Sequence, residues 1–330
     1  MVDLPITAVY FLFGLVPILL LSIAILSNSL LSDIRLSWIW FILVMILIDF
    51  VHIFVTFPVY LNRSKALFPK IKTRLIIPIF VILLTMLASV FCTRYFLFIV
   101  AYVTLLHIAR QQGGILKSLL RKDQTSFPNV HLTAYWIIFL IPLLHLHSSA
   151  SLFAPYYFTT GDMIRPLPGE LMAWVHKVLP PLFLIYFFVF LFGFFKLKKI
   201  SKHILVMQFG TFLWFYGGWC LLPQSVFYFS MAPILHGASY IFFSIEAQDS
   251  FLRESSDNKK RTHLYYVIST LGAVLVWMFI REELIRNSTD LYLNLYSKIF
   301  WGLLWAPGMV HAFLDTFIWR SSVVQKSLAH

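Results

Sequence analysis

The chain has 330 residues, of which 60% are hydrophobic and 12% are charged, with a formal net charge of +12. A soluble domain is about half apolar and about a quarter charged, so this composition excludes a soluble protein. It predicts an integral membrane protein with the lipid bilayer as its solvent. The basic excess lies in short loops between apolar runs, which is typical of topology signals facing anionic lipid and not of a nucleic-acid-binding protein.

Ten apolar stretches are long enough to cross a bilayer as helices. In chain order they cover residues 5–27, 36–57, 75–93, 94–112, 132–154, 177–195, 203–222, 224–245, 264–280 and 295–319. No polar segment between them reaches the usual length of a soluble domain. The sequence therefore predicts an all-α, polytopic transmembrane bundle of about ten spans, folded as a single integral membrane domain over residues 1–330.

The distribution of Lys and Arg tests this number of spans, because cytoplasmic loops hold an excess of both. Ten spans place nineteen of these residues on one side of the bilayer and seven on the other. The nineteen occur in five groups, at 63–74, 110–122, 196–202, 253–261 and 320–326. Their common side predicts that both termini lie in the cytoplasm, and we expect the cytoplasmic (inner) membrane of a bacterium as the location.

Four of the spans contain a histidine with a polar residue three or four positions away. The pairs are His52 with Asp49, His107 with Gln111, His236 with Tyr240, and His311 with Asp315. This spacing puts both members of a pair on one helix face. At ~1.5 Å per residue, all four histidines lie roughly 12–14 Å inside the predicted cytoplasmic boundary. Four imidazoles at one depth predict a shared metal site, in which the four polar partners orient the ligands from the outer shell.

The other histidines have weaker patterns. His145 and His147 lie deeper, in the fifth span, and two positions apart cannot share a helix face. His145 is a candidate for a substrate cavity or a proton relay, with helix packing as the alternative. The remaining histidines are expected in loops or at interfaces, in contact with water: His131, His176, His203, His263 and His330.

The order of the histidine motifs resembles a known family. Bacterial and archaeal membrane β-carotene-cleaving dioxygenases have single histidines on separate transmembrane helices, and their last helix ends with a His, an Asp and an aromatic–Arg pair. The segment VHAFLDTFIWR resembles that ending, with His311, Asp315, Trp319 and Arg320 in the corresponding places. The earlier histidine helices of the family are similar to IDFVHIFVT, LLHIARQQ and LHGASYIFF. The His-to-Asp spacing is one residue shorter here, and the family's Pro-His-Gly signature is absent.

The resemblance implies a non-haem Fe(II) centre with four imidazole ligands that activates O2 against an apolar polyene. The sequence thus predicts a membrane-embedded, iron-dependent oxygenase for a hydrophobic, carotenoid- or lipid-like substrate that enters from the bilayer. Two alternatives stay open. A b-type haem protein would use histidine pairs that span the bundle, and a transporter would use His and Asp as a proton or metal relay.

Overall fold

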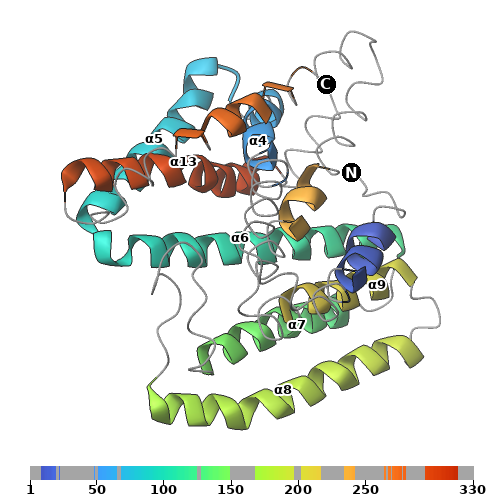
Figure 1. The fold of residues 1–330 in the computed structure, drawn as a ribbon. Helices are drawn as coiled ribbons and strands as arrows, with labels where there is room; N and C mark the ends of the chain where they lie inside the picture. Colours follow the sequence, from blue (N-terminus) through green and yellow to red (C-terminus); the bar gives the residue numbers. More distant parts are fainter. Residues whose placement is uncertain are drawn as a thin grey trace. The chain divides into compact units, whose positions relative to one another are not determined.

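Figure 1 shows the fold as a computed structural model. The structure describes residues 9–19, 22, 48, 51–64, 68–124, 128–148, 168–196, 202–216, 234–241, 264, 267–268, 270–276, 278–279 and 294–318. Within these ranges the regular secondary structure is helical and no strand occurs, so the predicted all-α class is confirmed. The α-helices are α4 (Val51–Arg63), α5 (Ile71–Phe91), α6 (Thr93–Lys122), α7 (Pro128–Ser148), α8 (Gly169–Lys196), α9 (Lys202–Phe212) and α13 (Leu295–Ile318). Two π-helical segments are η1 (Tyr10–Leu15) and η6 (Ile234–Ala238).

The chain divides into two compact units. Unit 1 comprises Met1–Val2, Met45–His107 and Phe243–His330, and unit 2 comprises Asp3–Val44 and Ile108–Phe242. Unit 1 therefore holds α4, α5, the first half of α6 and α13. Unit 2 holds the second half of α6, the helices α7 to α9 and both π-helical segments.

In unit 1, α13 packs along α5 and also contacts α4 (Figure 1). The buried side chains of α5 recur every three or four residues, so they form one face: Arg74, Pro78, Val81, Thr85 and Ser89. Gly302 of α13 permits the close approach, since a Cβ there would lie 2.7 Å from the Cα of Met86 and would also meet the Ser89 hydroxyl. That hydroxyl donates to the backbone carbonyl of Lys298 at 2.7 Å. A small residue and a backbone hydrogen bond thus hold the two helices together.

The opposite side of α5 is apolar and exposed. Ile76, Phe80 and Leu84 are each more than half exposed, and so are Leu184 and Phe188 of α8. Among the residues that the structure describes, two helical stretches are long and apolar enough to cross a membrane, Ile71–Phe91 and Gly169–Phe192. A bundle of about ten spans stays a prediction.

In unit 2, α7 packs against α8, and α9 contacts both α7 and η1. Aromatic rings fill part of this interior: Phe212 stacks between Tyr186 and Tyr216, at centroid distances of 5.6 Å and 5.1 Å. Gly210 of α9 lies so close to the Phe13 carbonyl of η1 that any Cβ would collide with it. Unit 2 is therefore tightly packed where α9 meets its neighbours.

Two helices of unit 2 contain a buried histidine at or just before the start of a predicted apolar span. Helix α7 begins at Pro128, a residue suited to the first helical turn, and therefore includes His131. This histidine is buried, with the Gln208 side-chain nitrogen 3.2 Å from its Nδ1. His203, in the first turn of α9, is also buried, with its Nε2 3.0 Å from an Asp123 carboxylate oxygen. The expectation that these two histidines contact water is wrong, because polar side chains take the place of water.

Candidate metal centre

Two predicted ligands of unit 1 face each other through their ring nitrogens. The Nε2 atoms of His107 on α6 and His311 on α13 lie 3.0 Å apart, and the two rings are nearly perpendicular. One turn along α13, Asp315 places its Oδ2 3.5 Å from Nε2 of His107 and 3.9 Å from Nε2 of His311. The three side chains are at most 9% exposed. Two imidazole nitrogens and one carboxylate oxygen therefore converge on one point among apolar helices.

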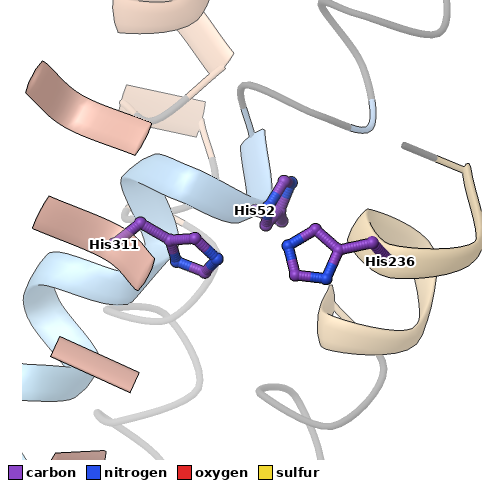
Figure 2. A group of neighbouring side chains, drawn as sticks. All are labelled: His52, His236 and His311. Atoms are coloured by element: carbon purple, nitrogen blue, oxygen red, sulfur yellow. The ribbon is translucent and has the colours of Figure 1, made fainter. Parts of the chain in front are cut away.

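A third imidazole comes from His52 on α4, which is 1% exposed. Its ring stands edge-on to that of His311, with centroids 4.7 Å apart. A ring nitrogen of His52 lies within 4.8 Å of a ring nitrogen of His311. Figure 2 shows the two rings turned toward one another. Three of the four predicted ligands are thus neighbours within unit 1.

Hydrogen bonds determine which nitrogen of each ring is protonated. Nδ1 of His52 lies 3.1 Å from the carbonyl oxygen of Ile48, and a carbonyl only accepts, so this nitrogen bears the hydrogen. The Thr56 hydroxyl donates its one hydrogen to the His52 carbonyl at 3.0 Å. It must therefore accept from Nδ1 of His311, which lies 2.5 Å away. In both rings the lone pair is consequently on Nε2, and a neutral imidazole binds a metal through such a nitrogen.

This protonation bears on the contact between His107 and His311. Because Nε2 of His311 has a lone pair, a separation of 3.0 Å requires either a hydrogen on His107 or a cation between the two nitrogens. With bonds of ~2.1 Å, two ligands at a right angle on an octahedral ion are about 3.0 Å apart, against about 3.4 Å at the tetrahedral angle. The observed distance therefore allows both nitrogens to bind one cation, and it equally allows a hydrogen bond from His107 to His311.

In unit 2, the predicted ligand His236 lies on η6 (Figure 2) and is buried. Its Nδ1 lies 2.6 Å from Oε1 of Gln111, and an amide oxygen only accepts. His236 therefore also bears its hydrogen on Nδ1 and presents Nε2. Sequence spacing paired Gln111 with His107, whereas the hydrogen bond joins it to His236. Tyr240, the expected partner of His236, is buried.

Asp49, His145 and His147 are three further residues that the sequence singled out. Asp49 and the side chain of His147 lie outside the described residues. The ring of His145 lies 6.0 Å from that of Tyr216, inside unit 2, which agrees with the packing alternative. Thr56 was missed by sequence reasoning, although it follows His52 by four residues and so shares its helix face.

No protein-family model, no curated protein and no solved structure matches this chain. The resemblance to carotene-cleaving dioxygenases therefore depends on the four short histidine segments alone.

Proposed function

We propose that this chain is a membrane-embedded metalloenzyme, a non-haem iron oxygenase acting on a hydrophobic substrate. The supporting observation is the buried group formed by Nε2 of His107, Nε2 of His311 and Oδ2 of Asp315. Two histidines and one carboxylate on one face of Fe(II) are the ligand set of many non-haem oxygenases. These three ligands leave other coordination positions of the iron open. The bound iron would supply activation of O2.

On this proposal Asp315 is a metal ligand. An orienting carboxylate would accept a hydrogen from the ring nitrogen that faces away from the metal. Asp315 instead approaches the Nε2 atoms of both His107 and His311, while Thr56 occupies Nδ1 of His311. Burying a carboxylate is costly unless charge or hydrogen bonds compensate it, and a divalent cation at this point would contribute compensating charge.

The surrounding side chains orient the ligands. Thr56 and the Ile48 carbonyl fix the hydrogen on Nδ1 of His311 and His52, and Gln111 does so for His236. His52 and His236 stay predicted ligands, because both present Nε2 and both lie at the sequence-predicted depth. Such outer partners raise the basicity of a ligand nitrogen and hold its ring in place.

The membrane setting is part of the same proposal. Exposed apolar faces on α5 and α8 support contact with lipid, and the charge asymmetry supports ten spans with both termini in the cytoplasm of a bacterium. A carotenoid- or lipid-like substrate would enter from the bilayer, where apolar helices exclude water from the reacting atoms. Cleavage of one C=C bond into two carbonyl groups takes up both atoms of O2, so the reaction needs no further reductant.

The geometry bears differently on the two alternatives. Axial haem ligands on opposite sides of iron would be about 4 Å apart at bond lengths of ~2.0 Å, so the 3.0 Å separation of His107 and His311 does not suit a shared haem. The relay alternative has one specific observation in its favour. Asp315, His107 and His311 form a short series of titratable groups, through which a proton could pass.

Metal analysis of the purified, detergent-solubilised protein tests the proposal. We expect about one iron per chain and no Soret band, with iron lost in His107→Ala and His311→Ala but retained in His145→Ala, the matched histidine of unit 2. Activity would be followed with a polyene substrate and isotopically labelled O2, whose two atoms should appear in the two carbonyl products. A Soret band would favour the haem alternative. Absence of metal from the purified wild-type protein would favour the relay.

A further inference from the structure

A second polar cluster of unit 1 surrounds a buried arginine. Arg74, near the start of α5, is 7% exposed. Its Nη1 donates to the carbonyl oxygen of Leu61, near the end of α4, at 2.5 Å. Its Nε has no hydrogen-bond partner, and no carboxylate in the described part of the chain pairs with it. A buried guanidinium is costly without a counter-ion, and the described residues place no carboxylate beside this one, so an anion from outside the chain would stabilise it.

Two hydroxyl groups accompany this guanidinium. Tyr60 lies near the end of α4 and Ser64 directly follows the helix, four residues on, and they are 1% and 2% exposed. Their hydroxyl oxygens have no hydrogen-bond partner in the described structure. Both the Arg74 charge and the Ser64 hydroxyl act on the Tyr60 hydroxyl, so the three groups are neighbours, although the two hydroxyls do not reach hydrogen-bonding geometry. Buried polar groups are almost always paired, which makes three adjacent exceptions informative.

The three unpaired groups have the same chemistry. The Nε–H of Arg74 and the hydroxyls of Tyr60 and Ser64 all donate hydrogen bonds. A water molecule could accept from them but would leave the guanidinium charge uncompensated. A phosphate group offers several acceptor oxygens together with negative charge, and Arg is the residue that most often recognises it.

We propose that Tyr60, Ser64 and Arg74 bind a phosphate group, either that of a lipid headgroup or a free phosphate ion. Arg74 lies one turn inside Ile71–Phe91, a stretch long and apolar enough to cross a membrane. It is therefore close to the boundary where lipid headgroups lie, and the exposed Lys70 and Lys72 add positive charge there. The site is independent of the metal centre, since Tyr60 follows His52 by eight residues, roughly 12 Å along α4.

The test measures the binding of three probes to the delipidated, full-length protein in neutral detergent. The probes are phosphatidylglycerol, a diacylglycerol with the same acyl chains, and inorganic phosphate. Arg74→Gln removes the charge, and a Tyr60→Phe/Ser64→Ala double variant removes only the two hydroxyls. Lys72→Gln is the control, an exposed cation on the same helix. We expect the phosphatidylglycerol affinity to fall about 10–100-fold in the first two variants and to change by no more than about twofold in the control.

The probes also separate the two sources. Binding of phosphatidylglycerol but not of inorganic phosphate or diacylglycerol supports a lipid headgroup, and binding of inorganic phosphate with the same dependence on Arg74 supports a free ion. The double variant should fold as well as the wild type without lipid, because the two hydroxyls that it removes have no hydrogen-bond partner in the described structure. It therefore tests the phosphate site even if Arg74→Gln does not fold. Wild-type affinity for every phosphate probe in both site variants overturns the proposal, whatever the iron content of the protein.

Discussion

The hydroxyl oxygen of Thr56 lies 2.5 Å from Nδ1 of His311 and 3.0 Å from the carbonyl oxygen of His52. One side chain of α4 thereby joins the two histidines that α4 and α13 contribute to the candidate metal centre. The threonine has a single hydroxyl hydrogen, and the His52 carbonyl takes it, so His311 can only donate to Thr56. The tautomer of His311 is therefore set by a residue that is not itself a predicted ligand.

Thr56→Val tests this role, because valine keeps the shape of threonine and removes the acceptor for Nδ1–H of His311. We expect the affinity for Fe(II) to fall about 10–100-fold, the usual effect of losing an outer partner of a metal-bound histidine. Thr56→Ser restores the hydroxyl and should recover most of the affinity. Competition titration with a coloured chelator measures all three proteins, and equal affinities in Thr56→Val and the wild type would contradict the assignment.

His236 is the predicted ligand whose membership depends on sequence alone, through its depth in the eighth span. We expect His236→Ala to lose iron as His107→Ala does, and Gln111→Leu to lose less, since it removes only the acceptor for Nδ1–H of His236. Elemental analysis of the three variants gives the comparison. Full iron in His236→Ala would restrict the centre to His107, His311, Asp315 and at most His52.

The sequence predicted the helical class and the candidate ligands because both depend on local patterns. Apolar length identifies helices, and a spacing of three or four residues puts side chains on one face. Neither pattern determines how a helix is rotated toward its neighbours. Gln111 was accordingly paired with the histidine on its own helix, and the contacts of Asp315 with both Nε2 atoms were not foreseen.

Close approach between helices was likewise invisible to the sequence. Glycines occur throughout apolar helices, and only the three-dimensional contacts distinguish Gly302, which faces the backbone of α5, from Gly308 in the same helix. His131 and His203 were misjudged for a related reason. Their polar partners, Gln208 and Asp123, come from other segments of the chain.

Gly302→Ala should separate α5 from α13, because the new Cβ would lie 2.7 Å from the Cα of Met86. Backbone cannot move aside as a side chain can, and overpacking of this kind costs about 1–3 kcal/mol. Gly308→Ala is the matched control, since its Cβ would meet only the Ile53 side chain at 3.9 Å. It should be neutral or stabilise by up to ~1 kcal/mol through helix propensity. Thermal unfolding in detergent compares them, and equal Tm values would contradict the packing.

The topology prediction concerns the loops at 63–74 and 155–175. Their different content of Lys and Arg predicts that the first lies in the cytoplasm and the second outside. Single cysteines introduced into each loop, with Cys92 and Cys220 replaced, should react with a membrane-impermeant thiol reagent only from opposite sides of sealed vesicles. Labelling of both loops from the same side would rule out ten spans with both termini in the cytoplasm.

Asp315→Asn and His311→Ala together separate the oxygenase from the relay. On the oxygenase reading both residues bind the metal, so both variants lose iron. We expect His311→Ala to lose it completely, and Asp315→Asn to keep the shape of the side chain but bind iron about 10–100-fold more weakly, since the amide removes the charge that faces both Nε2 atoms.

On the relay reading the order reverses, because Asp315 would then be a titrating group and the metal would be irrelevant. Asp315→Asn would abolish pH-dependent transport, and bound metal would be the same in every variant. The measurement is iron content together with the pH dependence of activity or transport, for both variants beside the wild type. His131→Ala is the control for loss of a buried imidazole. Wild-type iron content in His311→Ala, with function lost only in Asp315→Asn, would reject the metal centre, since an ion held by His107, His311 and Asp315 cannot survive removal of the ligand that contacts the other two.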